Sequence, residues 1–247
     1  MKIFSMTDIG RRRETNQDYI YTSEKPVGNL PNLFIVADGM GGHNAGDFAS
    51  RYTVEQVVGT IAASALTEPI ALMGEALRKV NYSLLQLARA DVQLQGTGTT
   101  FVAATIANGQ MSVANVGDSR LYVINQKITQ VTRDHSLVEE MVRMGEMRPE
   151  EARVHPDKNI ITRAVGAVRE LKADFFEVEL MPGDRVLLCS DGLTNMIEDQ
   201  EICRMICSCK DIAKCVELLV RTANENGGRD NISVIIVDPF SDEVVRC

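Results

Sequence analysis

Four aspartates in this chain stand where an apolar, strand-like run meets a glycine or a turn. They are Asp38, Asp118, Asp191 and Asp230. A carboxylate at the end of a buried strand is costly unless it has a positive partner, and a neighbouring glycine lets the backbone turn sharply and approach a ligand closely. Four such strand ends can converge on hard metal ions, which prefer oxygen ligands. Only the fold can bring positions so far apart in the sequence to one place.

Apolar periodicity divides the chain into strands and helices of a mixed fold. Short apolar or β-branched runs predict strands, and apolar residues that recur every three or four positions predict helices. Strands are expected at 3–7, 19–22, 33–36, 175–180, 185–189 and 232–237, an antiparallel meander within 98–131, and helices at 45–61, 69–87, 136–144, 201–207 and 211–226. Strands do not alternate strictly with helices, which disfavours a doubly wound parallel sheet. The order favours an α+β fold in which two antiparallel sheets pack together with helix pairs outside.

The chain shows no point at which it would divide into separate domains. It contains no proline-rich linker, charge block or low-complexity segment, so residues 1–247 are expected to form a single domain. Ser136 and Glu139 have the spacing of a capping box, which predicts the start of a helix. The polar, irregular segment 145–169 that follows can cover a site as a flap.

Charge and hydropathy exclude some classes of partner. The net charge of −8 argues against nucleic acid, whose phosphate backbone needs a basic surface. A phosphorylated substrate remains compatible with this net charge, because bound metals or a local cationic site make the charge at the binding site positive. No apolar stretch is long enough to span a bilayer, and the first residues lack the apolar segment of a secretory signal. A cytoplasmic location and a monomer are the default expectations.

The cysteines cluster near the C-terminus of the chain. Cys203, Cys207, Cys209 and Cys215 lie close in sequence, and the first two are spaced to share one helix face. A zinc site is conceivable, but no histidine is near and no Cys-x-x-Cys pair is present. Reduced thiols packed as small hydrophobic residues are the favoured interpretation. Cys247, the last residue, is expected to be free and reactive.

The motifs around the four aspartates occur in a family order together with further motifs. The chain resembles the metal-dependent protein phosphatases, the PPM or PP2C family, in their bacterial form. The segments that carry this resemblance are 7–10, 13–18, 37–43, 96–100, 116–120, 134–136, 161–166, 190–192 and 228–231. Each motif alone is weakly specific, but together they are highly specific and cover essentially the whole chain.

The resemblance implies a four-layer α-β-β-α sandwich with a binuclear Mn²⁺ or Mg²⁺ centre at one end. By motif position, Asp38 bridges the two metals and the carbonyl of Gly39 ligates one of them. Asp191 and Asp230 complete the shell of the first metal. Two divalent ions that share one hydroxide lower its pKa and hold it in line with a phosphorus atom. Water then attacks directly, and no phosphoenzyme is expected.

The resemblance assigns three further residues at the same site. Asp118 matches the residue that helps to hold a third, weaker metal, and Asp18 acts through metal-bound water. Arg13 matches the arginine that binds phosphate, a role that suits a planar guanidinium fork. The basic run 11–13 could also be only a solvated loop, but the position of Arg13 five residues before Asp18 is the one the motif requires.

Two positions depart from the pattern of animal relatives. Met40 stands where those proteins have a histidine proposed as the general acid, and Gln17 stands where they have glutamate. His43 lies three residues after Met40, and a buried or capping role is at least as well supported for it as a catalytic one. The donor of the leaving-group proton therefore stays open. His135 is interpreted as structural.

The implied function is hydrolysis of phosphoserine and phosphothreonine on proteins, with a eukaryotic-like Ser/Thr kinase as the expected counterpart. Three alternatives are a non-catalytic regulator with the same fold, a phosphatase of an anti-sigma-factor antagonist, and a metal-binding structural protein. The presence of all the expected aspartates argues against a regulator without activity.

Overall fold

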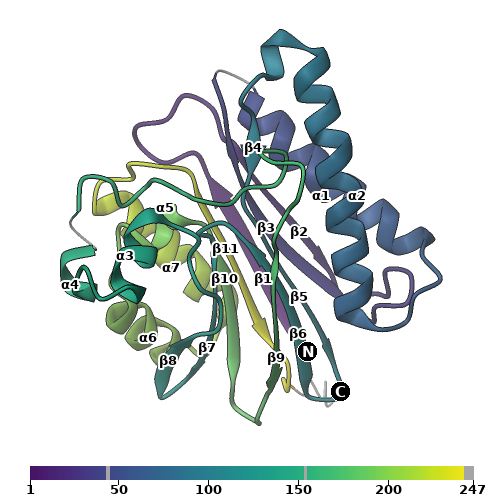
Figure 1. Cartoon of the computed structure of the whole chain (residues 1–247). Coiled ribbons are helices and arrows are strands. Elements are labelled where there is room, and N and C mark those ends of the chain that lie inside the picture. The colour runs from purple at the N-terminus through teal and green to yellow at the C-terminus, as the bar shows by residue number, and fades with distance from the viewer. Residues whose placement is uncertain (43–44, 153–154, 242–247) are drawn as a thin grey trace.

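Two antiparallel sheets form the middle of the molecule in the computed structural model, which describes residues 1–42, 45–152 and 155–241 (Figure 1). The strands of the first sheet, in spatial order, are β1 (Lys2–Asp8), β11 (Ile232–Asp238), β10 (Arg185–Cys189), β7 (Arg120–Asn125) and β8 (Lys127–Gln130). Those of the second are β2 (Asp18–Ser23), β3 (Leu33–Met40), β5 (Phe101–Ala107), β6 (Gln110–Val116) and β9 (Asp174–Glu179), and the short β4 (Gly98–Thr99) pairs with β3.

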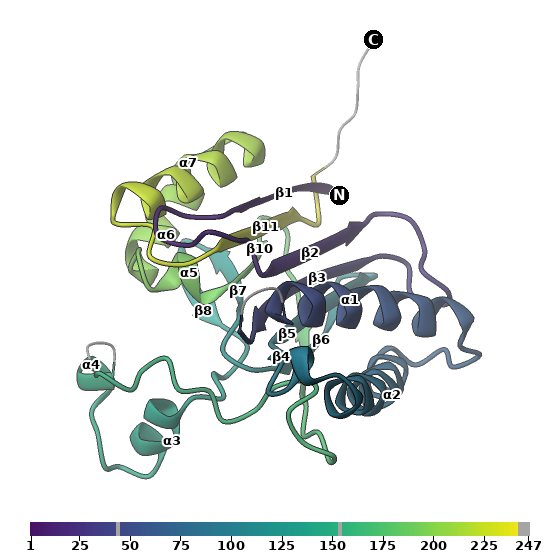
Figure 2. The same ribbon diagram turned by 90° about the horizontal axis from the view of Figure 1, so that it is seen from above.

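Helices cover the outer face of each sheet. The pair α1 (Ala45–Ala63) and α2 (Pro69–Ala90) packs on the second sheet, and α6 (Asp199–Ser208) and α7 (Ile212–Glu225) pack on the first. Figure 2 shows these layers edge-on, with the helix pairs on opposite sides of the sheets. In the part of the chain that the structure describes, four shorter helices lie in the connections, namely η1 (Val92–Leu94), α3 (Leu137–Arg143), α4 (Pro149–Ala152) and α5 (Asp191–Thr194).

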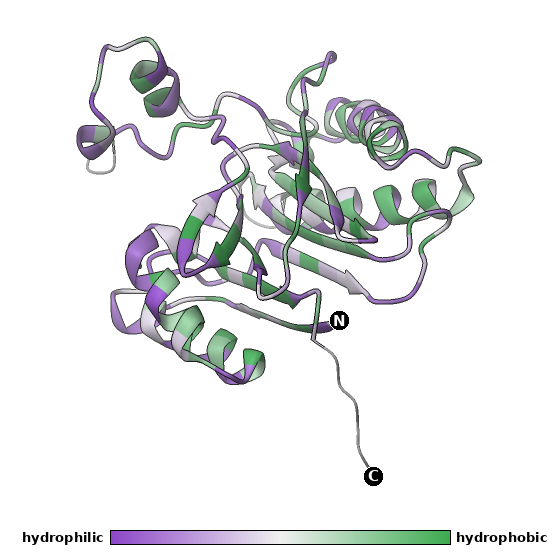
Figure 3. Ribbon diagram, turned by 90° about the horizontal axis from the view of Figure 1, so that it is seen from below, coloured by the Kyte–Doolittle hydropathy of each residue, from purple (hydrophilic) through white to green (hydrophobic). Residues whose placement is uncertain are grey.

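Strand alternation explains why the central strands read as continuous apolar runs. On β3, Leu33 and Ile35 face the α1/α2 layer, whereas Phe34 and Val36 face the other sheet. A strand covered on both faces needs apolar residues at every position. Figure 3 shows the same effect, because the inner strands are largely hydrophobic while each long helix carries both colours. The three apolar clusters between four layers confirm the predicted α+β sandwich of two antiparallel sheets flanked by helix pairs.

The predicted single meander over 98–131 is wrong, because its strands belong to two sheets. β5 and β6 pair in the second sheet, whereas β7 and β8 pair in the first. The chain changes sheet between Val116 and Arg120, where Gly117 has φ +100° and a Cβ on it would lie 2.7 Å from the side chain of Thr100. Both sheets use short apolar strands, so local turn signals do not tell a change of sheet from an ordinary hairpin. The crossing places Asp118 at one end of the sandwich.

The helix starts follow local capping chemistry. Pro69 occupies the first turn of α2, and the Glu68 carboxylate accepts hydrogen bonds from the backbone N–H groups of the next turn. Ser136 caps α3 as the capping-box spacing predicts, since its hydroxyl accepts the Glu139 N–H. The one-turn α5, which begins at Asp191, was not predicted. Among the described residues, no helix is long and apolar enough to cross a bilayer.

Truncation of a side chain between the sheets should destabilise the protein far more than truncation at the surface. Leu188 is fully buried there, whereas Leu66 is 40% exposed. We expect Leu188→Ala to lower the free energy of unfolding by about 2–5 kcal/mol and Leu66→Ala by less than about 0.5 kcal/mol. Urea titration of both variants measures this, and equal losses would contradict the assignment of the core.

Candidate functional site

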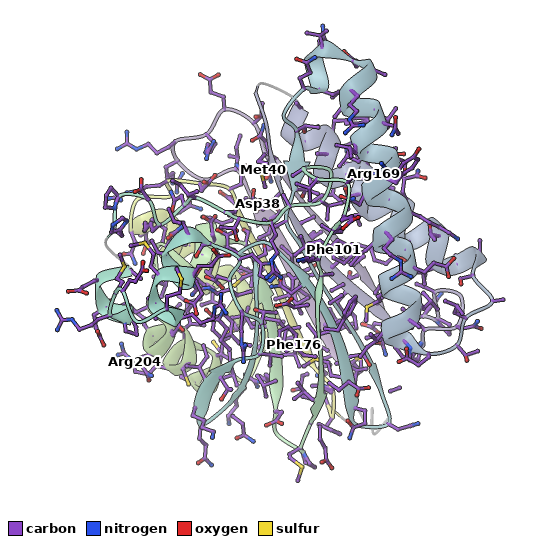
Figure 4. The ribbon with its side chains drawn as sticks, viewed as in Figure 1. Asp38, Met40, Phe101, Arg169, Phe176 and Arg204 are labelled. Carbon is purple, nitrogen blue, oxygen red and sulfur yellow. The ribbon has the colours of Figure 1, made fainter. Side chains whose placement is uncertain are left out.

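Several of the singled-out residues meet in one pocket at an end of the sandwich. The pocket has a volume of about 240 Å³, and segments from both sheets line it. The residues it shares with the sequence-based assignments are Arg13, Asp38, Gly39, Asp118, Asp191 and Asp230. Asp38 comes from the end of β3, Asp191 is the first residue of α5 just after β10, and Asp230 lies in the turn before β11. The structure therefore brings together the four aspartates that follow or precede strands. Figure 4 labels Asp38 and Met40 at this end of β3.

Backbone hydrogen bonds fix the position of Asp38. Its N–H donates to the Thr100 hydroxyl at 2.9 Å, and its carbonyl accepts from the Thr100 N–H at 2.8 Å. The next residue, Gly39, donates its N–H to the Gln17 carbonyl at 3.0 Å. A Cβ at Gly39 would lie 2.0 Å from the Gly46 carbonyl oxygen, so only glycine fits between these two segments.

Asp18 and Asp191 each have one carboxylate oxygen held and one buried without a partner among the described residues. Ser190 donates its hydroxyl to Asp18 Oδ2 at 2.7 Å, and Asn195 donates its amide to Asp191 Oδ2 at 2.8 Å. The two Oδ1 atoms have no hydrogen-bond partner. Asp18 lies directly opposite Asp38 in the β2–β3 pairing, but it is buried behind the pocket and does not line it.

Asp230 and Arg13 form an ion pair at the mouth of the pocket. Arg13 Nη2 donates to Asp230 Oδ2 at 2.8 Å, and the two side chains are 49% and 27% exposed. The loop that carries Arg13 is tied down by Asn231, whose amide donates to the carbonyls of Ile9 and Thr15. Ser190 and Asn231 were not predicted as site residues. Their positions beside Asp191 and Asp230 in the motifs were the available signal.

The predicted flap segment also contributes to the pocket. Asn159 and Ile161 line it, and Lys158 donates its ammonium group to Asn195 Oδ1 at 2.9 Å. Asn195 in turn holds Asp191. The segment is thus connected to the acidic pocket through a short chain of side-chain hydrogen bonds.

Burial and mutual repulsion make the pocket unfavourable for negative charge. Burial raises the pKa of Asp18 to about 7. Hydrogen bonds to its carboxylate lower this pKa, and the nearby carboxylates raise it further. Burial and the charge of Asp230 raise the pKa of Asp191 to about 6. Burial and neighbouring aspartates also raise the pKa of Asp38 and of Asp118 well above the ordinary value. Bound cations would reverse these shifts.

The donor chemistry fits hard divalent cations. Oxygen ligands suit Mg²⁺ and Mn²⁺. The pocket offers carboxylates, and among the described residues Asp191 in the pocket and Asp18 behind it each have an unpartnered oxygen. Within the described residues, no three His, Cys, Asp or Glu side chains form a ready-made ligand cluster. The pocket therefore supplies the ligand type but not a closed set of ligands in this arrangement.

Met40, His43 and His135 were also singled out in the sequence. Met40 lines the pocket, and His43 lies outside the described residues. His135 is buried, its Nδ1 accepts the Gly117 N–H at 3.1 Å, and its Nε2 lies 3.1 Å from Asp174. It anchors the sheet crossing and does not line the pocket, in agreement with a structural role.

The cysteine cluster contains free thiols in the part of the chain that the structure describes. Cys203 and Cys215 are buried, Cys207 is exposed, and the sulfurs of Cys203 and Cys207 are 4.0 Å apart. No group of three potential zinc ligands forms among the described residues. Cys247, predicted to be free and reactive, lies outside them.

Comparisons with known proteins agree on one family. A family model described as protein phosphatase 2C matches residues 10–234. The serine/threonine phosphatase stp of Listeria monocytogenes is 40% identical over 237 residues, which cover 94% of this chain and 93% of that protein. The crystal structure of the serine/threonine phosphatase Stp1 from Staphylococcus aureus has a TM-score of 0.89 at 34% identity and covers 95% of this chain and 93% of that one. The catalytic domain of the serine/threonine protein phosphatase PstP in complex with 2 manganese ions has a TM-score of 0.83 at 30% identity, covering 95% of this chain and 96% of that one.

The metal-free protein should lose stability as the carboxyl group of Asp18 ionises. Its pKa of about 7 lies above the unfolded value, so the folded state binds the proton more tightly and stability falls between about pH 4 and pH 7. Each pH unit within this interval costs roughly 1.4 kcal/mol, or roughly 2–4 °C in Tm for a chain of this size. Asp18→Asn removes the charge and keeps an acceptor for Ser190.

Thermal melts in chelator at about pH 6 and about pH 8 measure this effect. The Tm of Asp18→Asn should exceed that of the unaltered protein by more at the higher pH. Asp47→Asn, at a position 38% exposed on α1, is the control and should show no such trend. A Tm difference between Asp18→Asn and the unaltered protein that is independent of pH would contradict the assignment.

Proposed function

Because the chain belongs to the protein phosphatase 2C family and is a protein-serine/threonine phosphatase, we propose that its acidic pocket is the metal centre at which phosphoserine and phosphothreonine esters are hydrolysed. The observation that carries the proposal is the convergence of Asp38, Asp191 and Asp230 from both sheets on one pocket. The unpartnered Oδ1 atom of Asp191 supports it, because a buried carboxylate oxygen without a donor suits a cation.

The proposed ligands are assigned by their positions in the family motifs and are supported by their place in the pocket. Asp38, the Gly39 carbonyl, Asp191 and Asp230 would hold two Mn²⁺ or Mg²⁺ ions, with the Asp38 carboxylate shared between them. Asp118, at the sheet crossing, would help to hold a weaker third ion together with Asp191. The bound ions supply Lewis acidity and lower the pKa of water at the site. Manganese is supported as a cofactor by the two ions bound to the related PstP domain.

The remaining steps fall to side chains of this chain. Asp18, behind the pocket and held by Ser190, orients water through its second carboxylate oxygen. Arg13 binds the phosphate. Its bond to Asp230 uses Nη2, and a guanidinium fork has further N–H donors for phosphate oxygens. Met40 has no proton to give, so the leaving alkoxide is protonated by another group.

The proposal extends to the chain as a whole. Residues 1–247 form one catalytic domain in which 145–169 acts as a flap over the pocket. The substrates are phosphorylated proteins, and a Ser/Thr kinase supplies them, because hydrolysis of these esters requires a reaction that forms them. The link from Lys158 through Asn195 to Asp191 supports the flap assignment.

Loss of a proposed metal ligand should abolish turnover. Groups that only support a metal ligand typically contribute tenfold to hundredfold, so we expect Asp38→Asn and Asp191→Asn each to lower kcat/KM for a phosphothreonine peptide by more than about a hundredfold. Chelator should abolish the activity of the unaltered enzyme, and added Mn²⁺ or Mg²⁺ should restore that activity. Asp47→Asn is the matched control and should stay active. Full activity in excess chelator would contradict a metal-dependent mechanism. Binding of the phosphopeptide without turnover would favour a non-catalytic regulator with the same fold.

Loss of Arg13 should weaken phosphate binding more than metal binding. A hydrogen bond to a charged group contributes about 1.5–3 kcal/mol, so Arg13→Ala should raise KM roughly tenfold or more. Arg12→Ala is the neighbouring control, since Arg12 is exposed and does not line the pocket. Kinetics at saturating metal, with a parallel metal titration, measure both effects. A large change in metal affinity with an unchanged KM would show that Arg13 has the wrong role.

A further inference from the structure

A second hollow adjoins the acidic pocket, and Met40 lines both. Its volume is about 440 Å³, which lies within the range of about 300–1,000 Å³ for ligand-binding pockets. The end of β3, the last turns of α2 and the segments 95–98 and 166–167 enclose it. Anything bound through its phosphate in the acidic pocket therefore has this hollow as its neighbour on the Met40 side.

The walls of the hollow are mainly apolar. Leu85 and Ala88 contribute from α2, Met40 from β3 and Ala167 from the opposite segment. Glycine backbone, Gln95 and Thr97 complete the rest of the surface apart from the rim. A methionine thioether is polarisable and adapts to different apolar partners. Such a lining favours an apolar side chain over a polar one, because a polar group would lose hydrogen bonds to water without replacement.

One positive charge stands at the rim. Arg89, exposed in the last turn of α2, is the charged residue among those that line the hollow. No carboxylate of the described residues forms an ion pair with it. On a chain with net charge −8, an isolated arginine beside an apolar hollow gives local attraction for a negative group.

Hydrogen bonds hold the walls in place. The Thr97 hydroxyl donates to the carbonyls of Ala45 at 2.7 Å and Met40 at 3.2 Å, which fixes one segment to the end of β3. On the other side, Asn81 of α2 accepts the Gly166 N–H at 2.8 Å and donates to the Val168 carbonyl at 2.9 Å. The hollow is thus built before any ligand arrives, which lowers the entropic cost of binding.

We propose that this hollow is a specificity subsite that binds the residues beside the phosphorylated residue of a protein substrate. An apolar side chain fills the hollow, and an acidic side chain next to it pairs with Arg89. The inference rests on the proposed function, because the phosphate in the adjoining pocket fixes the register of the peptide. Because Met40 lines both the acidic pocket and the hollow, the residues next to the phosphorylated one are those that reach the hollow.

The test compares phosphothreonine peptides with para-nitrophenyl phosphate, which has no flanking residues. The peptides carry Leu or Asn, and Glu or Gln, at one and two positions on either side of phosphothreonine. We expect kcat/KM, taken relative to para-nitrophenyl phosphate, to favour Leu over Asn by about tenfold or more on one side. Glu should be favoured over Gln by about three- to fivefold at the adjacent position.

Matched variants separate the apolar and the charged contributions. Ala167→Phe fills the hollow and should remove the preference for Leu, whereas Val168→Phe, at an exposed neighbour that does not line it, should keep that preference. Arg89→Glu should reverse the preference for Glu, and a peptide with Lys at that position should recover turnover by this variant. The recovery cannot come from a general loss of folding.

The outcomes distinguish this inference from the function on which it rests. Turnover of all peptides at equal relative rates, unaffected by Ala167→Phe and Arg89→Glu, overturns the subsite and leaves the phosphatase activity standing. A protein that hydrolyses neither peptides nor para-nitrophenyl phosphate with Mn²⁺ overturns both. A preference for Leu that Ala167→Phe removes, together with the charge reversal at Arg89, establishes the subsite.

Discussion

Repulsion between carboxylates at one end of the sandwich is the constraint on which the rest of the site depends. Asp18 and Asp38 face each other across neighbouring strands, and Asp191 and Asp230 approach from the other sheet. Strand pairing and the backbone hydrogen bonds of Asp38 prevent these groups from moving apart. The fold thereby stores an unfavourable arrangement of like charges that cations relieve, which is typical of sites whose function overrides local stability.

Polar side chains hold the two sheets together at this end, where the apolar core stops. Ser190 donates its hydroxyl to Asp18 of the second sheet and accepts the Ser233 N–H from β11 of the first. Asn231, just before β11, accepts a hydrogen bond from the N–H of Gln17. This bond also joins the first sheet to the start of β2 in the second sheet. These directional bonds fix the distance between the two halves of the site more sharply than apolar contacts do, because packing alone tolerates small shifts between layers.

The sequence contains enough information for most elements and for the family, since apolar periodicity and ordered motifs are read locally. The change of sheet at Gly117 was missed because its turn resembles that of a hairpin, and only long-range packing decides which sheet the next strand joins. The pairing of Arg13 with Asp230 and the role of Asn195 depend on contacts between distant segments. The subsite proposed beside Met40 could not be found from the sequence. Met40, Gly96 and Gly166 lie in family motifs, but only the fold brings these segments next to the end of α2.

The pairing of β1 with β11 has a consequence for the growing chain on the ribosome. The first strand of the first sheet hydrogen-bonds to the last one, which also separates it from β10. Such a contact between distant parts of the sequence forms late in folding. A nascent chain that lacks residues 230–238 has no Asp230 and cannot complete this sheet. The acidic pocket is therefore assembled only after Asp230 and the β11 segment have been synthesised, so a nascent chain that ends before them has an incomplete pocket.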